Sequence, residues 1–476
     1  MLHMKTPTII ILFFLVIVHS GCEKMLDKEP VDQLSIEATF EDFDGAKAAL
    51  AGAYFSLFDI NYYNGLRSIY PDLTGGNVKH SKTAGIDLLS EYSFASTAAQ
   101  SEMNATYGAL YAILNNLNYI IQKAPVVADG TLAQTNRLVA EATALRALVH
   151  FDLLQLYAQP YNYTTDASHL GIVINLEPVF VNSSIIKRST VKQGYDAVLT
   201  DLNQAAVLMA KSEVVFTVGS SSNYMNANSI NALLARVYLN MEDWKNAYEC
   251  AGKVIAVKSY SLFSNANYVN SWTLKNTSES IFEVSVPNNF SGNSYGSYFT
   301  LGQTYLQMAT TNDLLDLYTA TDVRGRDSFY ISSNIKGVLY YFSKKYPTAA
   351  TAATGVKVIR LSEMYLVRAE AAAELGNQSQ ANADLNLIRQ RGDASATALN
   401  LSTKDALITA ILLERRKELN LEGFLLFDLA RRKKNVLRTD CMSNTCNLNY
   451  PNAHYILPIP EQSVLTNANM VQNPEY

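Results

Sequence analysis

The segment IRLSEMYLVRAEAAAELGNQSQANADLNLIRQR, residues 359–391, decides the fold class of this chain. Apolar or small residues recur in its first half at helical spacing, at Leu361, Met364, Tyr365, Ala369, Ala372 and Ala373. Gly376 then ends the first helix, because glycine readily adopts the left-handed conformation that closes many helices. A second helix follows, with Ala381, Leu385 and Ile388 on its inner face. Small side chains let two helices approach closely, so the segment predicts a packed helix pair.

The same pattern occurs earlier in the chain, over residues 239–255. A turn there precedes Trp244, and small or apolar residues follow at Ala247, Ala251 and Val254. Within this stretch, residues 241–254 align with residues 375–388 without a gap. Both stretches are typical of the turn and second helix of a tetratricopeptide unit, although neither meets the full signature of that repeat. The alternative interpretation is two unrelated amphipathic helix pairs.

Composition places the chain among folded proteins with a sizeable core. It has 476 residues, of which 48% are hydrophobic and 17% charged, enough for two or three domains or one large helical domain. The net charge of −5 argues against nucleic acid as a partner, because phosphate neutralisation requires a basic surface. Tyrosine is abundant, with 29 residues against two tryptophans. Its flat ring and hydroxyl suit contact with polar ligands such as sugars, although most tyrosines are expected to pack between helices.

The N-terminus predicts a signal peptide over residues 1–21. A weakly basic start precedes the apolar run 9–18, which is too short to span a bilayer. Ser20 and Gly21 stand before Cys22 as in a bacterial lipobox, so Cys22 is the predicted lipidated N-terminus of the mature chain. Residues 22–34 then form a lipidated tether. The alternative is an ordinary secreted protein cleaved nearby. No later segment is long and apolar enough to cross a membrane.

Three further cysteines follow. Cys441 and Cys446 bracket a short polar loop in a compartment that permits disulfides, so the sequence leaves a local bridge and two free thiols both open. No histidine cluster accompanies them, which argues against a zinc site. Cys250 lies in a helical stretch and is expected to be a small buried hydrophobe.

Helical periodicity predicts further helices at 40–58, 104–123, 135–157, 191–209, 404–420 and 422–432. The pattern dissolves in two stretches rich in Tyr, Asn, Ser and Gly, at 59–101 and 259–346. The second holds one clear strand, 280–286, and a short helix at 314–318. Irregular connections this long are more often functional than bare connectors, so we expect them to carry the ligand.

Several short motifs occur in order and at family-like spacing along the chain. They are Cys22-Glu23-Lys24, EATALRA (141–147) with Phe151-Asp152-Leu153, RLSEMYL (360–366), ERRKEL (414–419) with Glu422-Gly423 and Phe427-Asp428-Leu429, Pro458-Ile459-Pro460, and Gln472-Asn473-Pro474-Glu475-Tyr476. With these motifs the chain resembles the SusD/RagB-type outer-membrane nutrient-binding lipoproteins, a family like that of the starch-utilisation system. Two departures stand out. Phe424-Leu425-Leu426 replaces a basic and an aromatic residue, and Glu475 stands where glycine is usual.

The resemblance implies a mainly α fold. It implies one SusD-like domain over residues 35–476, a tetratricopeptide-like scaffold of about four helix pairs with an irregular, ligand-bearing insertion that contains short strands. It also implies a lipid-anchored protein on the surface of the outer membrane, which captures an oligosaccharide or another nutrient as the lid of a SusC-type TonB-dependent transporter. It implies neither a cofactor nor catalysis. The alternatives are a protein–protein interaction scaffold and capture of a non-glycan nutrient such as a peptide.

The residues themselves do not argue for an enzyme. Glu414 and Glu418 lie one helical turn apart, so their carboxylates share a face, a placement compatible with an acid/base pair. In glycosidases, however, the two carboxyls flank a cleft at a separation of about 5–9.5 Å and usually come from different elements. We therefore interpret them as part of a charged network that braces a helix. The six histidines lack metal-ligand spacing, and no metal site is predicted.

Candidate ligand contacts combine aromatic faces with amides, as sugar recognition requires. The first irregular stretch offers Tyr62, Tyr63, Asn64, Tyr70 and Asn77. The second offers Trp272, Asn289, Asn293, Tyr295 and Tyr298. Trp272 precedes the strand 280–286, and a place in the core is an equal alternative for it.

Overall fold

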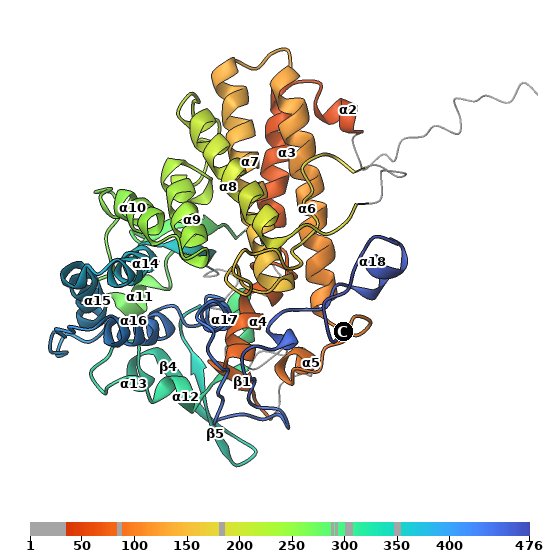
Figure 1. Cartoon of the computed structure of the whole chain (residues 1–476). Coiled ribbons are helices and arrows are strands. Elements are labelled where there is room, and N and C mark those ends of the chain that lie inside the picture. Colours follow the sequence, from red (N-terminus) through yellow and green to blue (C-terminus); the bar gives the residue numbers. More distant parts are fainter. Residues whose placement is uncertain are drawn as a thin grey trace, which may run out of the picture.

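Helices packed side by side build most of the molecule, and short strands lie beneath one end of them (Figure 1). The structure is a computed structural model that describes residues 35–82, 88–179, 186–286, 290, 294–299, 308–346 and 354–476. The predicted signal peptide, Cys22 and the tether lie outside the described residues. Among the described helices, none has the length and apolar character needed to cross a bilayer.

Nine long helices occur in the described part of the chain and build this scaffold. They are α3 (Phe43–Ser56), α6 (Met103–Lys123), α7 (Leu132–Tyr157), α8 (Val191–Met209), α9 (Ala227–Asn240), α10 (Trp244–Ile255), α14 (Leu361–Glu374), α15 (Gln378–Gly392) and α16 (Lys404–Glu418). Contacts run from neighbour to neighbour: α3 packs on α6, α6 on α7, α7 on α8, α8 on α9, α9 on α10, α10 on α14, and α14 on α15 and α16. The predicted helical scaffold is present, with α3/α6, α7/α8, α9/α10 and α14/α15 as four neighbouring pairs.

The two repeat-like segments fold alike. The turn of each pair holds one residue in the left-handed region, Glu242 at φ 61° and Gly376 at φ 79°. The next residue caps the second helix: the Asp243 carboxylate accepts from Asn246 N at 3.2 Å, and the Asn377 side chain accepts from Gln380 N at 3.1 Å. The predicted inner faces are buried in both copies, at Ala247, Ala251, Val254, Ala381, Leu385 and Ile388.

The first irregular stretch contains a helix that the sequence pattern did not predict, α4 (Leu66–Gly75). All of its residues are buried, although its apolar side chains do recur at helical spacing. Pro71 inside the helix, a residue type that usually ends helices, obscures this pattern in the sequence. The buried polar groups of α4 are paired. The Asp72 carboxylate, for example, accepts from the backbone N–H groups of Leu421 at 3.0 Å and Gly423 at 2.7 Å.

Strands are also more numerous than predicted. A four-stranded antiparallel sheet has the order β1 (Val78–His80), β3 (Met308–Thr310), β5 (Val338–Ser343), β4 (Tyr330–Ile335). The predicted strand is present as β2 (Ser280–Val284) and pairs antiparallel with β6 (Val356–Arg360), which leads directly into α14. β4 and β5 form a hairpin closed by the two residues Lys336-Gly337, so their pairing is local. The pairs β1/β3 and β2/β6 instead join segments far apart in the sequence, which no local pattern could indicate.

Short helices complete the described chain. They are α2 (Ile36–Thr39), α5 (Leu89–Tyr92), α11 (Tyr268–Ser271), α12 (Asn312–Leu315), α13 (Arg326–Phe329), α17 (Leu425–Arg431) and α18 (Glu461–Leu465), with 3-10 turns η2 (Ala124–Val126), η3 (Ser221–Asn223), η4 (Tyr295–Tyr298) and η5 (Ala453–Tyr455). One large hydrophobic cluster contains side chains of the long helices and of both irregular stretches. The described parts of those stretches are therefore packed into the body of the protein.

Candidate functional site

The tyrosines predicted to contact ligand in the first irregular stretch surround a buried carboxylate. Tyr62 and Tyr63 donate their hydroxyls to Asp152 Oδ2 at 2.8 and 2.6 Å. Arg67 donates to Asp152 Oδ1 from Nε at 3.0 Å and from Nη2 at 2.6 Å. Both tyrosines are at most 4% exposed. Their place in the structure is a polar cluster that joins α4 to α7, and not a surface that a ligand could reach.

The other predicted residues of this stretch are also buried. Asn64 and Tyr70 are 3% and 2% exposed, and Asn77 is fully enclosed. Asn77 donates to Asp72 Oδ1 at 2.6 Å and accepts from Arg416 Nε at 2.9 Å. Asn77 therefore connects the end of α4 to α16.

In the second stretch, Trp272 lies in the core, which is one of the two places that the sequence left open for it. It is fully buried, and three cations lie against its ring: Lys345 Nζ at 4.2 Å from the centroid, and Lys357 Nζ and Arg360 Cζ both at 5.3 Å. Such cation–π contacts are strongest where water is excluded. The indole thus forms part of an internal charged cluster.

Tyr295 and Tyr298 are buried as well, at 2% and 4% exposure. The Tyr295 hydroxyl donates to the backbone carbonyl of Leu421 at 2.9 Å. Asn289 and Asn293 lie outside the described residues. The described candidates of the second stretch therefore also pack inside the protein in this structure.

Glu414 and Glu418 meet a buried arginine from the insertion. Arg324 Nη1 donates to Glu414 Oε1 at 2.6 Å and to Glu418 Oε2 at 2.8 Å, and Asp322 pairs with the same guanidinium at 2.8 Å. Burial by itself would raise the pKa of Glu418, but Arg391, Arg360 and Arg324 hold it well below its usual value. A carboxylate held charged by three arginines braces α16, as the sequence interpretation stated. The main partners come from distant segments and not from the adjacent Arg415 and Arg416.

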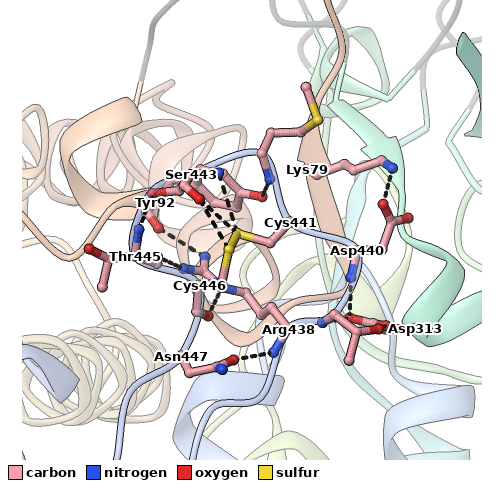
Figure 2. Close-up of a disulfide and its surroundings, with 12 residues drawn as sticks. Lys79, Tyr92, Asp313, Arg438, Asp440, Cys441, Ser443, Thr445, Cys446 and Asn447 are labelled. Carbon is pink, nitrogen blue, oxygen red and sulfur yellow. Dashed lines mark hydrogen bonds and ion pairs between the residues drawn. A yellow bond between two sulfur atoms is a disulfide. The ribbon is translucent and has the colours of Figure 1, made fainter.

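The cysteines of the polar loop are bridged. Cys441 and Cys446 form a disulfide with their Cα atoms 5.8 Å apart (Figure 2). Cys250 is a buried free thiol. The bridge holds a loop that Arg438 spans, donating to the carbonyls of Cys446 at 2.6 Å and Thr445 at 2.7 Å. The geometry is that of a structural disulfide within a loop.

The same loop is tied to the sheet and to α12. Asp440 pairs with Lys79 of β1 and accepts from the backbone N–H of Asn312 at 2.7 Å (Figure 2). Asp313 accepts from the backbone N–H of Thr439 at 2.7 Å. These contacts position three segments that are far apart in the sequence.

A polar hollow of about 590 Å³ offers the chemistry expected of a sugar site. We name it the serine pocket; it is lined mainly by Ser220, Ser221, Ser222, Asn226, Asn228, Ser259, Tyr260, Asn276, Thr277 and Ser278, with Arg137 at its wall. Half of these residues belong to the second irregular stretch. Asn228 Nδ2 donates to the Tyr260 hydroxyl at 3.4 Å, and Ser222 Oγ donates to Asn276 Oδ1 at 3.0 Å. Hydroxyls, amides and one half-buried tyrosine ring suit a hydroxyl-rich ligand. Sequence reasoning missed this pocket because its residues converge from four separate segments.

A larger groove of about 980 Å³ runs along α16 and α17. We name it the α16 groove. Its aliphatic floor includes Ile408, Leu412 and Leu425, while Leu413 and Leu437 are 45% and 61% exposed beside it. Charged side chains of both signs surround this floor, at Glu374, Lys404, Asp405, Arg416, Asp428, Arg432 and Lys434. An apolar floor with a charged rim suits a protein segment better than a sugar.

Comparison with known proteins agrees with this architecture. The family model described as "SusD family" matches residues 213–476, more than half of the chain, and a second model described as "Starch-binding associating with outer membrane" matches residues 26–239. The chain belongs to the SusD family. The family description thus links this SusD-family member to carbohydrate binding and to the outer membrane.

Individual relatives are similar over nearly their whole length. The curated SusD-like protein P38 of Formosa agariphila is 23% identical, with 90% of this chain and 91% of that protein covered. A SusD superfamily crystal structure from Bacteroides thetaiotaomicron is 27% identical with a TM-score of 0.82, covering 91% of this chain and all of that one. A putative sugar binding protein from Bacteroides vulgatus is 26% identical with a TM-score of 0.80, covering 92% and 99%.

Proposed function

We propose that this SusD-family protein is a cell-surface glycan-binding lipoprotein. It captures a nutrient oligosaccharide and delivers it, as a lid, to a SusC-type TonB-dependent transporter in the outer membrane. The observation that carries the proposal is the match over nearly the full length of both chains to a solved structure described as a putative sugar binding protein. The serine pocket supports it, because its hydroxyl and amide groups lie partly in the insertion that the sequence assigned to the ligand.

Anchoring belongs to the same proposal. We expect signal peptidase to remove residues 1–21 and Cys22 to carry the acyl chains, each buried methylene contributing about 0.8 kcal/mol to membrane binding. Residues 22–34 would then connect the folded body to the membrane. Labelling with a radioactive fatty acid in the native type of host tests this step: Cys22→Ser should abolish both the label and the membrane fraction.

The capture role is tested by a binding screen on residues 23–476, a form that retains every described contact. Affinity gels and calorimetry against plant, host and microbial oligosaccharides should yield a ligand with micromolar affinity. Tyr260→Ala in the serine pocket should weaken that binding by about tenfold, the loss of one aromatic contact. The matched control is Phe55→Ala, which removes an aromatic side chain that is 64% exposed on α3. If the wild-type protein binds no oligosaccharide of the panel, either alone or with its transporter, the result would contradict glycan capture and favour a peptide or other nutrient as the ligand.

A second candidate function, protein–protein interaction, is favoured by the α16 groove. It coexists with capture if the groove binds a segment of the transporter. Leu413→Glu and Leu437→Glu place a charge on the aliphatic surface, and they should reduce co-purification with the transporter while leaving glycan affinity unchanged. Leu465→Glu is the control, because Leu465 is 73% exposed on α18, outside the groove.

A further inference from the structure

A second pocket lies where the C-terminal tail crosses the loop that follows α7. Its volume is about 360 Å³, within the range of about 300–1,000 Å³ typical of small-ligand sites. We name it the tail pocket; the residues that matter for its chemistry are Gln159, Tyr163, His169, Leu170, Asn452 and Glu475. It shares no lining residue with the serine pocket.

The tail pocket presents an open aromatic surface. Tyr163 is 42% exposed, and its ring centroid lies 5.2 Å from that of His169. The imidazole is held on both nitrogens, with Nδ1 2.9 Å from Thr164 Oγ1 and Nε2 3.1 Å from the carbonyl oxygen of Gln159. A neutral imidazole satisfies both contacts, donating from Nε2 and accepting at Nδ1. The pair offers a rigid, uncharged face on which the C–H surface of a sugar ring can pack.

Amide groups in the wall of the pocket have unused hydrogen-bonding capacity. Gln159 donates from Nε2 to the carbonyl of Asn452 at 3.0 Å, and its buried Oε1 has no partner among the described residues. Asn452 accepts from the backbone N–H of His454 through Oδ1 at 2.9 Å, and no described residue accepts from its Nδ2. The Asn452 Nδ2 donor therefore remains for a ligand hydroxyl, while the unpartnered Gln159 acceptor is buried in the wall of the pocket.

Glu475 sets the charge of the tail pocket. It is exposed, and no Lys or Arg occurs among the described residues that line the pocket. Its backbone lies in the left-handed region at φ 68°, a conformation that glycine adopts far more readily than other residues. A glutamate in a backbone conformation that disfavours it thus brings a carboxylate to the pocket. By contrast, the serine pocket has Arg137 in its wall.

We propose that the tail pocket is a second saccharide-binding site, selective for neutral over anionic sugar units, with Glu475 as the residue that determines this selectivity. The inference rests on the proposed function, since it assumes that the protein binds glycans. Tyr163 and His169 supply the stacking surface, and Asn452 donates to a ligand hydroxyl. The Glu475 carboxylate repels uronate groups and accepts hydrogen bonds from neutral hydroxyls.

Calorimetry with a short neutral oligosaccharide found in the screen tests the second site. Wild-type residues 23–476 should bind two molecules per chain, and Tyr163→Ala should bind one, with at least a tenfold loss of affinity at the affected site. Tyr260→Ala should weaken the other site by about tenfold, and Phe55→Ala should change neither. If the wild type binds a single molecule and Tyr163→Ala does not change that binding, the proposal of a saccharide site in the tail pocket would be overturned. Glycan capture by the protein would still be supported. Failure of the wild type to bind any glycan would overturn both.

The selectivity is tested on a Tyr260→Ala background, where binding at the serine pocket is weakened and the tail pocket is expected to be the tighter site. Affinity for a neutral oligosaccharide should exceed that for an oligogalacturonate of equal length by at least tenfold. Glu475→Gln, of equal size but uncharged, should reduce that ratio to less than threefold. Equal affinities before the substitution, or a ratio that the substitution does not change, would overturn the role of Glu475.

Discussion

Arg360 and Glu418 are joined by two hydrogen bonds: Arg360 Nη1 donates to Glu418 Oε1 at 2.6 Å, and Nη2 donates to the Glu418 carbonyl at 2.8 Å. Arg360 is the last residue of β6 and caps α14, whereas Glu418 ends α16. The same guanidinium reaches Glu422 Oε2 from Nε at 2.7 Å. Two of the family-like sequence motifs therefore meet in one buried ion cluster.

Removal of the cation from this cluster is expected to be costly. Arg360→Met should lower the free energy of unfolding by about 3–5 kcal/mol, because it leaves buried carboxylates unpaired. Urea denaturation followed by circular dichroism measures this loss. Lys192→Met, which breaks the exposed pair with Asp196, should cost less than about 1 kcal/mol. Equal costs for the two variants would contradict the structural role of the cluster.

The tyrosines around Asp152 are expected to stabilise the fold and to leave ligand binding unaffected. Tyr63→Phe removes a hydrogen bond to a buried carboxylate and should cost about 1.5–3 kcal/mol of unfolding free energy. Its glycan affinity should equal that of the wild type. Tyr163→Phe, at an exposed ring, serves as the control for stability. A loss of affinity in Tyr63→Phe without a loss of stability would restore Tyr63 to the ligand site.

His150 predicts a pH dependence of stability. Burial, aided by the charge of Arg146, lowers the pKa of His150 to about 3, and its Nε2 accepts from the backbone N–H of Asn175 at 3.1 Å. Below pH 6.5 the unfolded chain binds a proton here and the folded protein does not, so stability falls as the pH falls. Between pH 6.5 and 5 this residue should account for about 2 kcal/mol.

His150→Gln isolates this contribution. The variant should be less stable at every pH, because the amide cannot reproduce the buried contact, but its free energy of unfolding should fall less between pH 6.5 and 5. Between pH 7.5 and 8.5 the difference between the two proteins should stay constant. Parallel curves over the whole range would show that His150 does not titrate between the folded and unfolded states.

The Cys441–Cys446 bridge predicts one free thiol, that of Cys250, in denatured residues 23–476 under non-reducing conditions. Thiol titration with Ellman's reagent measures it, and three thiols would show that the bridge is absent. Cys441→Ser/Cys446→Ser should cost about 2 kcal/mol or less, because the closed loop is short. Cys250→Ser is the matched control for removal of a cysteine.

The sequence by itself determined the helical scaffold, the repeat-like pairs and the family. These properties are local: apolar spacing, small residues and turn residues act within one or two helices, so they can be read along the chain. The bounds of α8, for example, follow from its pattern and from the Thr190 cap. Helix α4 was not predicted because it is short and has Pro71 in its interior, a residue type that usually ends a helix, although its apolar residues do recur at helical spacing.

Only the tertiary structure decided which polar and aromatic residues face a ligand. Tyr62, Tyr63 and Trp272 have the composition of a sugar site, but charges from distant segments, Asp152 and Arg360 among them, draw them into the interior. The tail pocket arises where Glu475 returns to the loop of Tyr163, more than three hundred residues earlier. Amino-acid type determines what a side chain can bind, whereas chain crossings of this kind determine whether a ligand can reach it.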